Sequence, residues 1–196
     1  PEDAYVAFAE SRFEIVPETE GTQLEMRHAY NTLVQAVSES RDSIDFSQTP
    51  EVYKKASVTQ DNQELIAARD ACNNFTKASI TYTFGEETVT LDGSTIKNWL
   101  SFDEKGQFIR DDATFQQHIL DYVAQLAADH DTVGTDREFY TTSGRTVYVY
   151  GSAYGWKIDQ AAEAAQLTQE IQSGTQTTRE PVYSMRARSY GRNDIG

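Results

Sequence analysis

The residues best suited to chemistry are one cysteine and three histidines, and their spacing predicts neither catalysis nor metal binding. Cys72 is the sole cysteine, so it has no partner for an internal disulfide or for a CxxC zinc site. His28, His118 and His130 each lack a second histidine at the four-residue spacing of a helical metal site. We therefore expect Cys72 to be a small buried residue on a helix, and His130 to offset the dipole at a helix C-terminus.

Two pairs of adjacent acids have the residue type that general acid–base catalysis uses. Asp111 and Asp112 precede a helix pattern, where free N–H groups favour carboxylates, while Glu86 and Glu87 fall in a hairpin turn. The chain also has no GxSxG, HExxH, Walker or GxGxxG motif. The sequence thus predicts no catalytic residue, no metal site and no cofactor.

The aromatic residues around "YGWKID" are the candidates for ligand binding. Tyr154, Trp156 and Lys157 stand just before a helix pattern, and Tyr148 and Tyr150 precede them in an alternating strand pattern. In one interpretation Trp156 is a plug that packs against the opposite copy of an internal repeat, described below, or against a neighbouring domain. In the other, these side chains form an aromatic platform for a glycan, with Lys157 as a hydrogen-bond donor. The two interpretations remain open on the sequence alone.

The second tryptophan, Trp99, lies in the short helix pattern "STIKNWL". It is a further candidate for sugar contact. The core interpretation is favoured, because Ile96, Trp99 and Leu100 fall on one helical face.

Composition and charge restrict the class of protein. Hydrophobic residues make up 38% of the 196 residues, as in soluble globular proteins. The net charge is −14, and the basic residues gather only in the tail over 186–192. Nucleic-acid binding is therefore not expected, because its affinity comes largely from neutralised phosphates. There is no apolar run of about 18 residues and no secretion signal, so we expect no membrane contact by this stretch itself. Its abrupt beginning and end lead us to expect a piece of a longer protein.

An internal repeat is predicted when the chain is compared with itself at a shift of 134 residues. Each copy, about 1–57 and 135–185, reads as two strands, a glycine, a helix and an extended segment, which is a ββαβ unit. The helices are expected over 23–40 and 159–173, and Gly174 has the place of a left-handed helix C-terminus. Matching positions include Phe13 with Val147, Gly21 with Gly155, Leu33 with Leu167, and Val37 with Ile171.

Between the copies, the pattern predicts a helix from a capping pair at Asp61 and Glu64 to about residue 75. Two strands around Gly85 and a helix within 108–131 follow. The apolar stripe of that helix is expected in the core: Phe115, Ile119, Tyr122, Val123 and Leu126. Together, the predicted helices and strands indicate an α+β fold with antiparallel sheets covered by helices. We expect one domain over 1–185, with subdomains at about 1–77 and 78–185, and a linker over 186–196.

Four stretches together resemble a known family: "DAYVAF…FEIVPETEGTQLE", "VTLDGSTIKNWLSFDEKG", "TTSGRTVYVYGSAYGWKID" and "TREPVYSMRA…NDIG". They are similar to the peptidoglycan-binding domain that precedes the catalytic domain in YkuD-type L,D-transpeptidases of Gram-positive bacteria. A related module occurs in VanW-like proteins. The resemblance covers essentially the whole chain.

The resemblance implies a non-catalytic module at the cell wall, on the extracellular side of the membrane and held there by an N-terminal anchor. Its expected partners are peptidoglycan, through glycan strands or stem peptides, and a transpeptidase domain following "NDIG" in the same chain. That domain carries a histidine and a Ser-His-Gly-Cys motif, which the sequence around Cys72 does not match. The alternative is a structural spacer that orients the catalytic domain and has no affinity for glycan.

Overall fold

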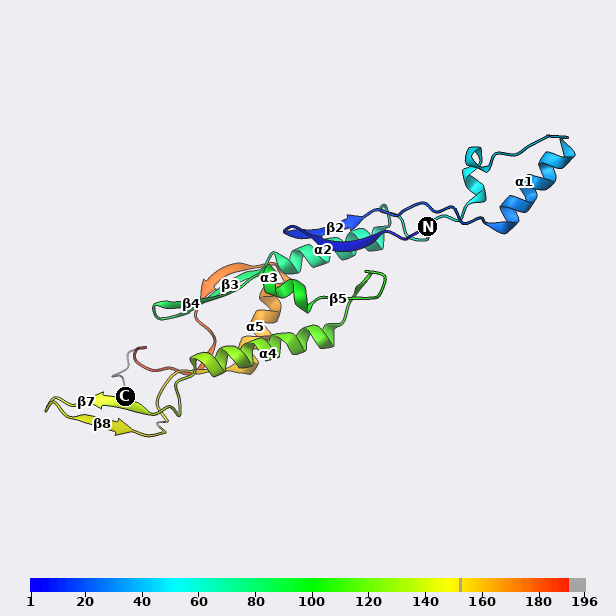
Figure 1. Cartoon of the computed structure of the whole chain (residues 1–196). Coiled ribbons are helices and arrows are strands. Elements are labelled where there is room, and N and C mark those ends of the chain that lie inside the picture. The colour runs from blue at the N-terminus through cyan, green and yellow to red at the C-terminus, as the bar shows by residue number, and fades with distance from the viewer. Residues whose placement is uncertain (152, 191–196) are drawn as a thin grey trace. The chain divides into compact units, whose positions relative to one another are not determined.

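The computed structural model describes residues 1–151 and 153–190, and Figure 1 shows its elements along the chain. The chain divides into two compact units. Unit 1 comprises Pro1–Asp70 with Phe102–Phe108, and unit 2 comprises Ala71–Ser101 with Ile109–Gly196. Within the described ranges, no helix is both long and apolar enough to cross a membrane. The "NDIG" motif and the rest of 191–196 lie outside the described residues.

The elements are mixed, and the α+β class expected from the sequence is confirmed. The helices are α1 (Met26–Ser38), α2 (Gln63–Thr76), α3 (Gly93–Ile96), α4 (Asp112–His130) and α5 (Gln160–Gln172), with 3-10 turns at Phe46–Gln48, Pro50–Val52 and Lys97–Trp99. The strands are β1 (Tyr5–Ala9), β2 (Arg12–Val16), β3 (Ser79–Phe84), β4 (Glu87–Leu91), β5 (Ser101–Phe102), β6 (Phe108–Ile109), β7 (Arg137–Tyr140), β8 (Thr146–Val149), β9 (Lys157–Ile158), β10 (Gln176–Arg179) and β11 (Tyr183–Met185).

Unit 1 begins with the predicted hairpin of β1 and β2. The strands pair antiparallel around a two-residue turn, in which Glu10 takes a left-handed φ of 52°. Phe13 is buried on this hairpin, with its ring 5.1 Å from that of Phe8 and 5.7 Å from that of Phe102. Aromatic packing of this kind compensates for the small size of a two-stranded sheet.

The helix α2 is capped by the residue that follows the predicted cap. The side chain of Asn62 accepts hydrogen bonds from the amides of Glu64 and Leu65, at 2.9 and 3.0 Å. The expected capping pair of Asp61 with Glu64 is therefore wrong, because Asn62 directly precedes the first helical residue and reaches both free N–H groups. The helix ends at Thr76, close to the predicted end.

The main sheet of unit 2 has the order β10-β3-β4. The pair β3–β4 is antiparallel, and Gly85 between them has the left-handed φ of 71° that such a turn needs. The pair β10–β3 is parallel, with Gln176 opposite Ser79 and Arg179 opposite Tyr82. The predicted antiparallel pairing is confirmed for β3–β4 but not for β10–β3, because the chain returns to the sheet through the helix α5, as parallel connections usually do.

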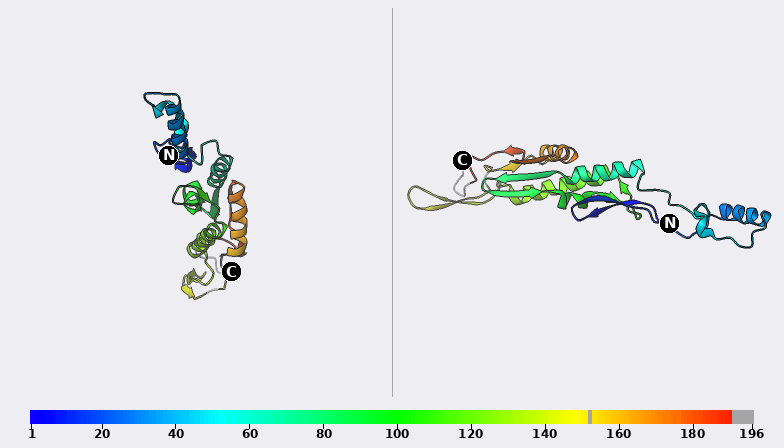
Figure 2. Two further views of the ribbon diagram at one scale, coloured as in Figure 1. Left: turned by 90° about the vertical axis from the view of Figure 1, so that its right-hand side faces the viewer. Right: turned by 90° about the horizontal axis from the view of Figure 1, so that it is seen from above.

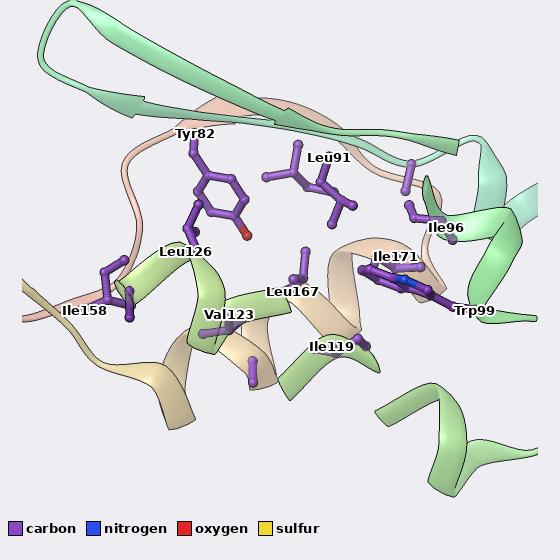
Figure 3. Packing of buried hydrophobic residues seen from close by; sticks show 14 of the residues in the cluster. Tyr82, Leu91, Ile96, Trp99, Ile119, Val123, Leu126, Ile158, Leu167 and Ile171 are labelled. Carbon is purple, nitrogen blue, oxygen red and sulfur yellow. The ribbon is translucent and has the colours of Figure 1, made fainter. Parts of the chain in front are cut away.

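The core of unit 2 lies between this sheet and the helices α4 and α5, as Figure 3 shows. Strand β3 alternates, with Ile80, Tyr82 and Phe84 buried and their neighbours partly exposed. The α4 stripe is in the core as predicted: Ile119, Val123 and Leu126 are buried, and Phe115 and Tyr122 pack against them. Leu167 and Ile171 of α5 fill the remaining side and are fully buried. Figure 2 gives two further views of these layers.

A buried ionic group fastens β10 to α5 and β3. The fully buried Glu163 accepts hydrogen bonds from Arg179 (2.7 Å), the Tyr82 hydroxyl (2.7 Å) and the Val182 amide (2.7 Å). Arg179 also pairs with Glu170 at 2.8 Å. Burial, and then the neighbouring Glu163 carboxylate, raise the pKa of Tyr82 well above its ordinary value. All oxygens of Glu163 are thus satisfied, as a buried charge requires.

The predicted repeat has matching helices and differing hairpins. Both α1 and α5 have thirteen residues and begin at an acid, Glu25 or Asp159, whose side chain accepts from the amide three residues later. In the hairpins, Phe13 is buried and faces Phe8, whereas Val147 is 45% exposed and faces Phe139. The β1–β2 turn has two residues and the β7–β8 connection is longer, which gives the two hairpins different registers. The repeat as a whole stays a prediction.

Candidate functional site

The corner before α5 is built around Gly155. Gly155 has φ 153°, and a Cβ there would lie 2.7 Å from the carbonyl carbon of Thr132. The backbone of the next residue, Trp156, is tied to the same segment: its N–H donates to the Thr132 hydroxyl at 2.9 Å, and its carbonyl accepts from the Thr132 N–H at 2.9 Å. Only glycine permits this close approach of two backbones.

The side chain of Trp156 is buried and packs on the segment that follows β11. Its ring stacks on Tyr190 with centroids 4.2 Å apart and 3° between planes, and lies 4.8 Å from Tyr183. Its indole N–H donates to the Ser189 carbonyl at 2.9 Å, and the Arg186 guanidinium lies 5.9 Å from the ring centre. We call Trp156, Tyr183, Tyr190 and Arg186 the Trp156 cluster.

The Trp156 cluster has the geometry of a plug. Only 7% of Trp156 is exposed, so its ring offers no free face to a sugar. The platform interpretation required an exposed ring, and the structure does not provide one at this residue. The surface that Trp156 covers is the segment over 183–190, rather than the opposite copy of the predicted repeat.

The other residues predicted to bind a ligand have surroundings that differ from one another. Tyr154 is partly buried, and its hydroxyl accepts a hydrogen bond from the Arg188 amide at 2.6 Å. Lys157 is exposed on β9, where its carbonyl accepts from the Ser184 hydroxyl. Trp99 is 8% exposed and packs in the core of unit 2, stacked on His118 with 9° between the rings. The core interpretation of Trp99 is therefore the one that the structure favours.

Exposed aromatic rings gather on the hairpin of β7 and β8 instead. Tyr140, Tyr148 and Tyr150 are between 53% and 73% exposed, and the rings of Tyr148 and Tyr150 stack with centroids 6.3 Å apart. The strand register places Tyr140 opposite Thr146 and Glu138 opposite Tyr148. Directly opposed residues and residues two apart share one face of a strand pair, so Tyr140, Tyr148 and Glu138 lie on the same face. Tyr150 follows β8 and joins them through the contact of its ring with Tyr148. We call this group the tyrosine face.

The tyrosine face combines flat apolar surface with polar groups. The Tyr148 hydroxyl donates to the Glu138 carboxylate at 2.7 Å, which holds the ring in place. That hydrogen bond, followed by the negative charge of Glu138, raises the pKa of Tyr148 above its ordinary value. Such rings suit the apolar faces of sugars, while the hydroxyl groups and the carboxylate can bind the sugar hydroxyls.

The side chains whose types could serve catalysis make contacts that stabilise the fold. Cys72 is fully buried on α2, and burial raises the pKa of its thiol to about 12, far from that of a reactive thiolate. His130 ends α4 and stacks on Phe84 at 3.7 Å, and Asp111 caps α4 by accepting from the Thr114 amide. Within residues 1–151 and 153–190, no three His, Cys, Asp or Glu side chains lie together as a metal site would require.

Sequence reasoning missed two residues of the tyrosine face and the buried ionic group. Tyr140 and Glu138 belong with Tyr148 because of the strand register, which depends on the length of the β7–β8 connection. Glu163 had a visible signal: it is the acid on the same helical stripe as Leu167 and Ile171. An acid on a core-facing stripe indicates a buried partner, which here is Arg179.

Comparison with known proteins identifies the family. The family model described as "Putative peptidoglycan binding domain" matches residues 58–179, which is more than half of the chain. The chain therefore belongs to this family, in agreement with the resemblance read from its sequence. The matched range contains α2 to α5, the hairpin of the tyrosine face, and the charged side chains Glu163, Glu170 and Arg179 of the buried ionic group.

Two solved structures are similar to the chain. One is an L,D-transpeptidase of Enterococcus faecium with its cysteine changed to serine, and the other is the carbamoyl enzyme that Ldtfm forms with avibactam. For each, the identity is 26%, the TM-score is 0.45, and the match covers 63% of this chain and 46% of that chain. The match thus spans less than half the length of those proteins. A search of curated proteins finds no match.

Proposed function

We propose that the chain is a non-catalytic cell-wall module that binds peptidoglycan and positions it for an L,D-transpeptidase domain farther along the same polypeptide. The observation that carries the binding part is the tyrosine face, an exposed and pre-ordered aromatic surface within a chain of the peptidoglycan-binding family. The positioning part rests on the sequence resemblance to the region before the catalytic domain of YkuD-type enzymes.

The proposed ligand is the glycan strand rather than the stem peptide. The rings of Tyr148 and Tyr150 lie nearly parallel, with 22° between their planes and centroids 6.3 Å apart, and Tyr140 lies on the same face of the hairpin. Exposed aromatic rings of this kind can pack on the apolar face of a sugar. On the face itself the charged residue is Glu138, while Arg137 and Arg145 belong to other parts of the same hairpin. A carboxylate among the rings disfavours the carboxylates of stem peptides at this place and leaves the neutral sugar rings as the better match.

Sedimentation with purified sacculi tests the proposal. The chain should co-sediment with sacculi, and the double variant Tyr148→Ala/Tyr150→Ala should bind about tenfold more weakly or worse, which corresponds to roughly 1.4 kcal/mol. The variant Tyr148→Phe/Tyr150→Phe keeps both rings and should bind at least partly. Tyr30→Ala is the matched control, because it removes an equally exposed tyrosine from α1.

Two outcomes would contradict the proposal in different ways. If the unchanged chain does not sediment with sacculi, the chain is a spacer that orients the catalytic domain. If the double variant sediments as well as the unchanged chain, peptidoglycan binds at another surface, and the tyrosine face is not the site.

A further inference from the structure

The tyrosine face has a negative charge among its rings. Glu138 lies opposite Tyr148 in the strand register, and Tyr140 follows it by two residues on the same face of β7 (Figure 1). Tyr150 completes the group through the contact of its ring with Tyr148. All four residues are exposed, so a ligand that reaches the rings also reaches the carboxylate.

The carboxylate of Glu138 has room for a further hydrogen-bond donor. Its Oε1 accepts from the Tyr148 hydroxyl at 2.7 Å. An ionised carboxylate has about four acceptor positions on its two oxygens, so one bond leaves most of them available. Within residues 1–151 and 153–190, none of the ion pairs includes Glu138. Its negative charge is therefore available to a cation on a ligand.

The two arginines of the hairpin belong to other parts of it than the tyrosine face. Arg137 directly precedes Glu138, so the alternation of a strand places it on the opposite face. Its guanidinium donates to the Thr132 carbonyl at 3.1 Å and lies 5.9 Å from the centre of the Tyr154 ring. Arg145 lies in the connection between β7 and β8. The hairpin thus keeps a carboxylate, and not a cation, among the exposed rings.

Aromatic rings beside a carboxylate are suited to an ammonium group. The ring faces attract a cation through their quadrupole, and the carboxylate accepts a charge-assisted hydrogen bond from its N–H groups. A neutral acetamide gains neither of these two charge interactions. The sugars of peptidoglycan are amino sugars, whose amine is either acetylated and neutral or free and positively charged. The carboxylate of Glu138 therefore favours one of two forms of the same sugar.

We propose that the tyrosine face prefers glycan units with a free amine over N-acetylated units, and that Glu138 is the residue that determines this specificity. The proposal rests on the glycan binding proposed above and adds which sugar unit is bound. One sugar ring packs on Tyr148 and Tyr150, and its ammonium group donates to Glu138. A lysine side chain of a stem peptide has the same ammonium group, but it lacks the apolar ring face that the tyrosines contact.

Titrations with two oligosaccharides of equal length test this proposal. One is an oligomer of glucosamine and the other an oligomer of N-acetylglucosamine, in a buffer in which the free amine carries its proton. The amide signals of β7 and β8 are followed by two-dimensional NMR. The Kd should be about fivefold lower for the glucosamine oligomer. Glu138→Gln keeps an acceptor for the Tyr148 hydroxyl and removes the charge, so this variant should bind both oligomers equally well.

Two controls separate the Glu138 carboxylate from the general attraction of an acidic chain for a polycation. Glu86→Gln changes the net charge by the same amount, at an exposed acid in the β3–β4 turn, and should keep the fivefold preference. A lysine peptide with as many amines as the glucosamine oligomer has the charge without the sugar rings. It should bind more weakly at the hairpin than the glucosamine oligomer does.

The results that would overturn the proposal differ from those that would overturn glycan binding. If the unchanged chain binds the N-acetylated oligomer as tightly as the glucosamine oligomer, or more tightly, the preference is refuted and glycan binding stands. If neither oligomer binds, glycan binding fails, and the preference fails with it. A preference that persists in Glu138→Gln, or that is lost equally in Glu86→Gln, would show that Glu138 does not determine specificity. A lysine peptide that binds the hairpin as tightly as the glucosamine oligomer would show that the sugar is not what is recognised.

Discussion

Unit 2 contains two aromatic groups of opposite character, although both come from the stretch between residues 137 and 190. In the Trp156 cluster, the Trp156 ring stacks on Tyr190 and its indole N–H donates to a backbone carbonyl. The contacts of this tryptophan are therefore structural, and its ring is not free to contact a ligand. On the tyrosine face, the rings stand on one side of a hairpin and stay exposed. The comparison teaches that the largest aromatic residue is here the structural one, and the smaller exposed rings are the candidates for ligand contact.

The largest effect is expected from removing the plug. Trp156→Ala deletes a buried ring and should destabilise the chain by about 3–5 kcal/mol. For a protein of this size, Tm should fall by roughly 2–4 °C per kcal/mol in a thermal melt. Sacculus binding measured well below Tm should stay unchanged. A stable variant that has lost binding would reverse the roles of the two groups.

The same contrast between buried and exposed groups should hold for ion pairs. Arg179→Met leaves the fully buried Glu163 carboxylate without its cation and should reduce the free energy of unfolding by about 3 kcal/mol. The control is Arg110→Met, whose partner Asp112 is exposed, and which should change stability by about 0–1 kcal/mol. Denaturant melts of both variants measure the difference. Equal losses would mean that the buried group around Glu163 contributes little to the fold.

Alkaline pH should act on the buried groups before it affects the tyrosine face. Burial raises the pKa of Cys72 from 9.0 to about 12 in the folded chain, so above pH 9 the unfolded state loses this proton first. Stability is therefore full below pH 9 and falls as the pH rises toward 12. Tyr122, raised by burial from 10.0 to about 12, adds to the loss above pH 10.

Cys72→Ala removes the earliest part of this loss. The onset in urea melts at a series of pH values should move from about pH 9 toward about pH 10, where the buried tyrosines begin to contribute. An onset that stays at pH 9 in this variant would show that Cys72 is not the group responsible.

The smallest effect on stability is expected at the tyrosine face. Tyr148→Ala removes an exposed ring and its hydrogen bond to Glu138, and should change the free energy of unfolding by no more than about 0.5 kcal/mol. A denaturant melt beside that of Trp156→Ala measures the contrast. A loss approaching that of Trp156→Ala would mean that the tyrosines support the hairpin rather than a ligand.

The sequence predicted the elements better than it predicted their partners. The α4 stripe and the two helices of the repeat follow from periodicity of 3.6 residues, which depends on neighbours in the chain. The parallel pairing of β10 with β3 was not predicted, since it joins segments almost a hundred residues apart. The burial of Trp156 likewise depends on Tyr183 and Tyr190, whose approach to the ring no local pattern encodes.

Two further predictions were wrong or incomplete for local reasons, namely the residue that caps α2 and the set of residues on the tyrosine face. Asn62 and Asp61 are both good caps, and a shift of one residue decides between them. Tyr140 joins Tyr148 and Tyr150 only because the β7–β8 connection sets the register that it does.

A titration of the isotope-labelled chain with soluble peptidoglycan fragments tests the central claim most directly, with amide signals followed by two-dimensional NMR. The account predicts that signals of β7 and β8 shift with increasing ligand, while the indole N–H signals of Trp99 and Trp156 stay in place. The two tryptophans are the only ones in the chain, so both signals can be assigned with single variants. Shifts centred on the indole of Trp156 with an unchanged hairpin would contradict the account, as would the absence of any shift at saturating ligand.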